Sequence, residues 1–225
     1  AWVVGMPLPD DETHAVADLN PASTGGFPSV GDGYGLGWDV AWLQAEGGDI
    51  AVVSDQAGVF DGEISGVVTL WRPEFGAVTP LSEEEGVGIH GIGSYEGFGY
   101  SVATGDYGGD GVEDLAVGSI HAEGQGEGTG AVFVYNSAAE LEGWRDERDA
   151  DVTFLGEDRN GPRASTPPLL GVRVAFAGDM NGDGREDLAM TAPFAEGLGG
   201  EVGAGAVYLA PGGLTDDEYA VEAAC

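Results

Sequence analysis

The chain has 225 residues, with 40 acidic and 7 basic side chains that give a net charge of −33. Such a surface repels nucleic acid and anionic membranes, which excludes both as partners, and it attracts divalent cations and basic proteins. Adaptation of the surface to salt remains an alternative explanation of the charge. No apolar stretch reaches the ~20 residues of a membrane helix, so no membrane insertion is expected. A single cysteine, Cys225, excludes a disulfide framework within the chain.

The 42 glycines and the short apolar runs between them predict an all-β protein with many tight turns. The chain opens inside an expected strand, so we interpret it as a fragment of a longer protein. Residues 1–20 have the pattern of the end of a repeat. A degenerate copy of the same repeat follows at residues 34–82, where the turn at 44–48 is short and poor in carboxylates. Strands are expected in this copy at residues 36–41, 49–53, 66–71 and 77–81.

Two fuller copies of the repeat occupy residues 93–155 and 166–221. Each copy runs from a first strand through an acidic, glycine-rich loop to a buried apolar strand, and then to a third and an outer strand. The outer strands are expected at residues 151–155 and from residue 219 onward. Four short strands per unit, repeated radially, are typical of the blades of a β-propeller. Between the copies, residues 138–142 predict a helical turn and residues 145–149 a solvated charged face.

The loop at residues 179–187 has the pattern of a calcium site. Oxygen-bearing side chains occupy its first, third, fifth and ninth positions, and the carbonyl of the seventh residue can add a backbone ligand. Calcium takes six to eight oxygen ligands in flexible geometry, whereas magnesium demands a stricter octahedron. An EF-hand is excluded because its twelfth position needs a bidentate Glu and a following helix, and Met190 stands there in a short apolar run. The expected ligands are Asp179, Asn181, Asp183, Arg185 and Asp187.

The loop at residues 106–114 repeats this pattern with one side-chain ligand missing, because its third position is a glycine. We therefore expect a second calcium site of lower affinity, with both ions in structural roles. An acidic turn without metal is the alternative interpretation of each loop. The expected ligands of the second site are Asp106, Gly108, Asp110, Val112 and Asp114.

The pair Phe98 and Gly99, the acidic loops followed by Asp-Leu, and the run at residues 191–193 resemble the FG-GAP repeat of integrin α-subunit propellers and their bacterial relatives. Leu170 replaces the expected Phe in the last copy. The resemblance implies a partial, calcium-stabilised propeller of three to four blades, extracellular or at the cell surface, that mediates adhesion. It implies an unknown protein or carbohydrate ligand bound away from the metal.

Nothing in the sequence predicts catalysis. His14, His90 and His121 are scattered in expected loops, and no nucleophile elbow, zinc-protease motif or phosphate-binding loop is present. Trp38 and Trp71 alternate with apolar residues and are expected in the core. The sequence therefore predicts a non-enzymatic calcium-binding propeller. The alternative is a propeller module of a secreted lyase or hydrolase that acts on polysaccharide.

Overall fold

The computed structural model describes residues 36–72, 87–157, 166–197, 201, 203–215 and 218–220. The expected partial repeat at 1–20 and the expected strand at 77–81 lie outside the described residues. Within these ranges the regular structure is β-strand, apart from two short 3-10 helices, and the strands form separate, mainly antiparallel sheets that largely correspond to the repeats. The expected all-β, partial β-propeller fold is confirmed.

The first sheet, blade 1, corresponds to the degenerate repeat. Its outer strand is β6, which the sequence reasoning did not identify. A fifth strand, β10, comes from the next repeat and pairs with β6 in parallel, and a small β3–β4 hairpin (Val59–Phe60 and Glu63–Ile64) joins β2 to β5. The strand order is β1 (Val40–Leu43), β2 (Ile50–Asp55), β5 (Val67–Trp71), β6 (Val87–His90) and β10 (Trp144–Asp146).

The second sheet, blade 2, follows the same plan. Four strands run antiparallel in chain order from the inner strand β7 outward, and the expected outer strand at residues 151–155 is confirmed. A fifth strand again comes from the following repeat and pairs in parallel with the outer strand. The strands are β7 (Phe98–Gly105), β8 (Asp114–Ser119), β9 (Ala131–Tyr135), β11 (Val152–Leu155) and β15 (Glu218–Ala220).

The third sheet, blade 3, has three strands: β12 (Arg173–Phe176), β13 (Leu188–Ala192) and β14 (Ala206–Ala210). The expectation that residue 219 begins the outer strand of this copy is wrong. Residues 218–220 form β15, which pairs with β11 of blade 2. β10 is added to blade 1 in the same way, so the segment after the third strand of each repeat extends the preceding blade.

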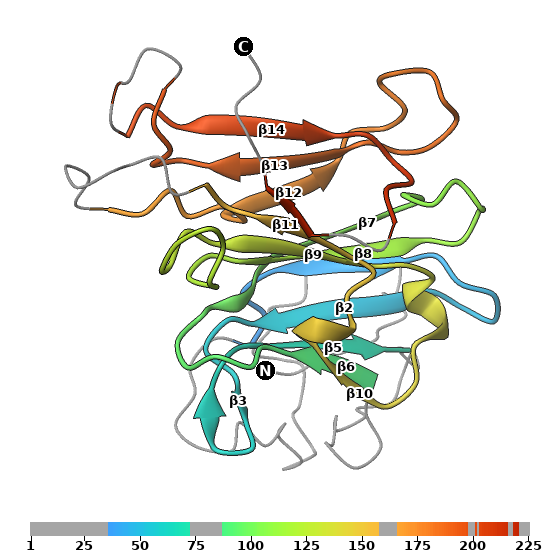
Figure 1. Ribbon diagram of the computed structural model, residues 1–225. Helices are drawn as coiled ribbons and strands as arrows, with labels where there is room; N and C mark the ends of the chain where they lie inside the picture. Colours follow the sequence, from blue (N-terminus) through green and yellow to red (C-terminus); the bar gives the residue numbers. More distant parts are fainter. Residues whose placement is uncertain are drawn as a thin grey trace, which may run out of the picture.

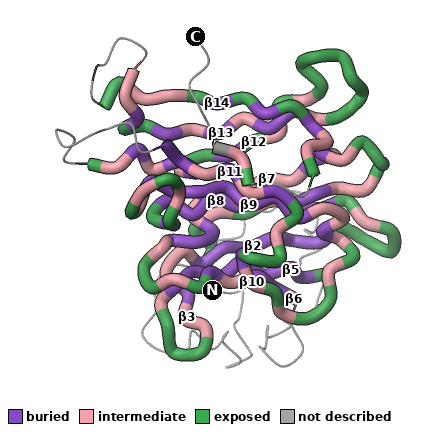
Figure 2. The backbone as a smooth tube through the Cα atoms, in the orientation of Figure 1, coloured by how far each residue is buried: buried purple, intermediate pink, exposed green. Residues whose placement is uncertain are grey.

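The three sheets stack on one another in chain order, with β12–β14 at one end and the sheet of β2, β5 and β6 at the other (Figure 1). Two apolar clusters fill the interfaces. One joins side chains of blades 1 and 2, including Val68, Phe98 and Phe133. The other joins blades 2 and 3, including Val132 and Leu188. The buried segments therefore run through the middle of the stack while the loops at its edges are exposed (Figure 2).

Blades 2 and 3 each pack on the preceding blade through the residue at the Phe position of the Phe-Gly pair, which is Phe98 in blade 2 and Leu170 in blade 3. The amide of Phe98 donates to the carbonyl of Ser65, and that of Leu170 donates to the carbonyl of Thr129. The neighbouring glycines, Gly66 and Gly130, have φ of 95° and 86°, and a Cβ on either would lie 2.1 Å or 2.3 Å from the oxygen of the docked residue. Only glycine permits both this backbone conformation and this approach. Phe98 and Leu170 are fully buried, so leucine replaces phenylalanine without loss of the contact.

Three sequence expectations are tested by burial. Trp71 is in the core as expected, but the expectation for Trp38 is wrong, because its side chain is 48% exposed and packs on Tyr100 at the surface. The expected helical turn forms as the 3-10 helix η2 (Ala138–Glu140). The charged run at 145–149 is not fully solvated, because the 3-10 helix η3 (Glu147–Asp149) buries the side chain of Glu147. No helix in the described ranges is long and apolar enough to cross a membrane.

Candidate metal centres

The loop at residues 179–187 connects β12 to β13 and folds around the carboxylate of its first residue. Asp179 accepts hydrogen bonds from the backbone amides of Gly182, Asp183 and Gly184, at 2.6, 3.0 and 2.9 Å. These bonds, that from Gly184 first, lower the pKa of Asp179, so the group stays ionised. Gly182 and Gly184 have φ of 83° and 89°, which explains the glycines at these positions.

The other polar side chains of this loop meet at Asn181. Its amide nitrogen lies 2.9 Å from a carboxylate oxygen of Asp183 and 3.3 Å from one of Asp187. Asp187 is buried at the start of β13 and also accepts from the amides of Met180 and Gly212. The third, fifth and ninth positions are therefore brought together, as the sequence predicts, around one amide group that carries both a donor and an acceptor.

The loop at residues 106–114 joins β7 to β8 and repeats the framework around the first carboxylate. Asp106 accepts from the amides of Gly109, Asp110 and Gly111 at 2.7, 3.0 and 3.0 Å. Asp114 accepts from Ser137, two residues after the third strand, as Asp187 accepts from Gly212, but its donor within the loop is Gly108, one position later than Met180. The second acidic loop is thus the same structure in the preceding blade.

The two loops differ at the third position. Gly108 supplies no side chain, so no group joins Asp110 to Asp114 as Asn181 joins its neighbours. Burial raises the pKa of Asp114, and the nearby charge of Asp110 acts in the same direction. The side chain of Arg185 reaches from the neighbouring loop, and its Nε donates to the carbonyl of Gly108 at 3.1 Å.

Both loops carry the oxygen-only donor set that a hard cation prefers. Among the described residues, however, no three His, Cys, Asp or Glu side chains converge closely enough to form a metal-binding group. The residues at 179–187 fit a calcium ion because Asn181 adds a fourth side-chain oxygen to the carboxylates of Asp179, Asp183 and Asp187. The backbone carbonyls of Arg185 and Val112, the expected seventh-position ligands, accept no hydrogen bond in the described part of the chain. The fit is poorer at 106–114, where the third side chain is missing.

Sequence reasoning missed the role of the eighth loop position. Glu186 accepts from the amide of Asp106, the first residue after β7, at 3.2 Å. Glu113 accepts from the amide and side chain of Gln44, the first residue after β1, at 2.6 and 3.1 Å. Each loop therefore holds the inner strand of the preceding blade. Both loops have Glu at the eighth position, and this repetition was a signal in the sequence that could have indicated the contact with the preceding blade.

Comparison with known proteins matches the inner three strands and the acidic loops of blades 2 and 3. The FG-GAP repeat family model matches residues 98–135 and 170–209. Integrin alpha-5 of Xenopus laevis is 33% identical over 126 residues, and integrin alpha-IIb of Mus musculus is 34% identical over 173 residues, which are 52% and 68% of this chain. Integrin alpha-PS2 of Drosophila melanogaster is 29% identical over 199 residues, 83% of this chain. The matched regions span 10%, 14% and 12% of these three relatives.

Proposed function

Because the chain carries FG-GAP repeats and is related to integrin α subunits, we propose that it is a non-enzymatic propeller segment that calcium stabilises and that binds a protein partner at the cell surface. The observation that carries this proposal is the repeated loop, whose first and fifth carboxylates accept from the amides of equivalent positions in two blades. The role of the ion is structural. It neutralises the loop carboxylates and fixes the end of the inner strand of each blade.

The third loop position sets the affinity of each site. At residues 179–187, Asp179, Asn181, Asp183 and Asp187 would hold the ion together with the carbonyl of Arg185. At residues 106–114, Asp106, Asp110, Asp114 and the carbonyl of Val112 would hold it more weakly, since Gly108 adds no side-chain oxygen. Two calcium ions of unequal affinity are therefore expected.

The two described histidines make structural contacts. The His90 ring stacks on Phe60 with the ring centroids 3.8 Å apart, and its Nδ1 lies 2.9 Å from the carbonyl oxygen of Gly91. His121 is exposed, and its backbone amide donates to Glu96. Neither ring has a described hydrogen bond to the carboxylate or hydroxyl partner that general acid–base or nucleophilic catalysis requires.

Calorimetric titration with calcium tests the proposal. We expect two binding events for the unaltered chain and loss of the tighter one in Asp183→Ala. Calcium at 100-fold excess over its Kd stabilises the folded form by about 2.7 kcal/mol per site. Asp183→Ala should therefore lower the melting temperature in calcium and change it little in excess chelator.

The matched control is Gly108→Asn, which restores the third ligand of the weaker loop and should raise its calcium affinity. An equal loss of stability in Asp183→Ala with calcium and with chelator would overturn the proposal, since Asp183 would then act only in the turn.

A further inference from the structure

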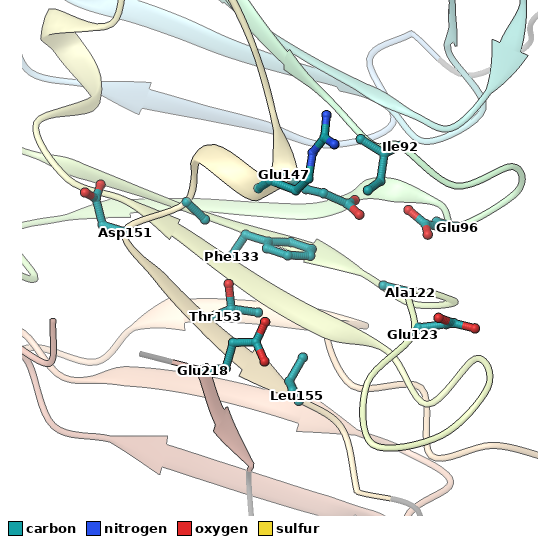
Figure 3. Close-up of a pocket in the computed structure, with 12 residues that line it drawn as sticks. Ile92, Glu96, Ala122, Glu123, Phe133, Glu147, Asp151, Thr153, Leu155 and Glu218 are labelled. Atoms are coloured by element: carbon teal, nitrogen blue, oxygen red, sulfur yellow. The ribbon is translucent and has the colours of Figure 1, made fainter. Parts of the chain in front are cut away.

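A cleft of about 580 Å³ lies at the outer edge of blade 2, and none of its lining residues belongs to either acidic loop. It is formed by strands β9 and β11, helix η3, the segment before β7 and the added strand β15. Pockets of this volume accommodate a side chain or a small organic molecule. Its wall is partly apolar, with Phe133 and Leu155 beside it, and Figure 3 shows the carboxyl groups of Glu96 and Glu147 turned toward each other at one end.

The charge of this cleft is strongly one-sided. Five carboxyl side chains line it, and the one basic residue beside them, Arg148, is already paired with Asp146 at 2.6 Å. A cavity with such a field attracts a cation and rejects an anion. The five are Glu96, Glu123, Glu147, Asp151 and Glu218.

Two of these carboxyl groups keep an oxygen without a partner. Glu147 is only 8% exposed, and its Oε2 has no hydrogen-bond partner among the described residues. The facing Oε2 of Glu96 is buried and equally unpartnered. A buried carboxyl oxygen without a hydrogen bond is costly, and a ligand that supplies the missing donors would offset this cost.

We propose that this cleft binds a guanidinium side chain of a protein partner, with Glu147 and Glu96 as its acceptors and Phe133 and Leu155 as the wall for its aliphatic stem. A planar guanidinium presents several N–H donors in a fixed fork, which suits two carboxyl groups that face each other. A bare calcium ion takes six to eight oxygen ligands, more than two facing carboxyl groups supply. The identity of the partner as a protein rests on the proposed function.

The test is titration of the whole chain, in saturating calcium, with Nα-acetyl-arginine N-methylamide, followed by NMR shifts and calorimetry. We expect saturable binding that weakens about tenfold in Glu147→Gln and in Glu96→Gln, since each change removes a charge-assisted hydrogen bond. Glu142→Gln, an exposed acidic residue outside the cleft, is the matched control and should bind as the unaltered chain does.

Affinity should also rise with pH, because burial and the facing Glu96 raise the pKa of Glu147 and the ligand needs the ionised form. Equal affinity in Glu147→Gln and Glu142→Gln, or no saturable binding, would overturn the proposal. Displacement of the probe by added calcium in the Asp183→Ala chain would also overturn it, in favour of a metal site. Retained probe binding in Asp183→Ala would show that the cleft stands independently of the calcium loops.

Discussion

Blades 2 and 3 have the same inner three-strand order and the same hydrogen bonds to the first loop carboxylate, yet the burial of their third strands differs. Val132 on β9 is fully buried, whereas Val207, at the equivalent place on β14, is 68% exposed. The adjoining pair, Val134 and Leu209, behaves in the same way, at 0% and 57%. Blade 2 is covered on both faces by its neighbours and blade 3 on one face in the described structure. Burial of the third strand is therefore a property of the stack and not of the repeat.

The second loop position shows the same contrast. Tyr107 is fully buried against Phe176 in the interface with blade 3, whereas Met180, its equivalent, is 62% exposed. Tyr107 and Met180 are both large side chains, so each can pack against a following blade. The comparison teaches that each repeat carries half of an interface and that its stability depends on the neighbour that completes it.

The largest difference between the blades is expected at the glycine before the third strand. In Gly130→Ala the new Cβ would lie 2.3 Å from the carbonyl oxygen of Leu170, on a residue with φ of 86°. Gly205, the equivalent in blade 3, has φ of 81° and its nearest neighbour at 3.1 Å. We expect Gly130→Ala to cost about 3 kcal/mol or more and Gly205→Ala about 1 kcal/mol, because only the first adds overlap to backbone strain. Urea unfolding of the two variants measures this difference, and equal losses would show that repeat docking is not the constraint.

The substitutions Val132→Ala and Val207→Ala compare how much the third strands of blades 2 and 3 contribute to the free energy of unfolding. The first change leaves a space in the cluster between blades 2 and 3, and we expect it to cost about 2 kcal/mol. The second removes two methyl groups from an exposed position and should change the free energy of unfolding by less than about 0.5 kcal/mol. Denaturant titration in saturating calcium makes the measurement. A substantial loss in Val207→Ala would mean that its face is covered in solution.

The sequence predicted the blades and the two loops because their patterns are local. The alternation of glycine, carboxylate and apolar residues at 106–118 and 179–192 is enough to place a loop before a buried strand. The added strands β10 and β15 could not be predicted in this way. Each pairs in parallel with a strand of the preceding blade, and such pairing depends on contacts distant in the sequence. Trp38 was misplaced for a similar reason, since alternation predicts a face but not what covers it.

The acidic cleft was also hidden from the sequence. Glu96 and Glu147 are separated in the sequence by three strands of blade 2, β7 to β9, and Glu147 lies in a run of charges that is typical of a solvated surface. Helix η3 turns that side chain inward because Asp146 caps it, accepting from the amide of Arg148, while Asp149 accepts from the amide of Asp146. The capping box is readable in the sequence, but the direction in which it points Glu147 is set by the strands around it.

Dependence on pH separates the buried carboxyl group of Glu147 from the exposed one of Glu142. Burial first, then the charges of Glu96 and Asp146, raise the pKa of Glu147 to about 8, while a hydrogen bond from the Ile92 backbone opposes the shift. The folded state thus favours the neutral acid, so this contribution to stability is full below the ordinary value of 4.5 and is lost as the pH rises through about 8. Glu147→Gln is neutral throughout, so its stability relative to the unaltered chain should increase across this window and then level off. Urea unfolding from about pH 5 to about pH 9 measures the difference, with Glu142→Gln as the control. Parallel curves for the two variants would mean that Glu147 is ionised in the folded protein at neutral pH.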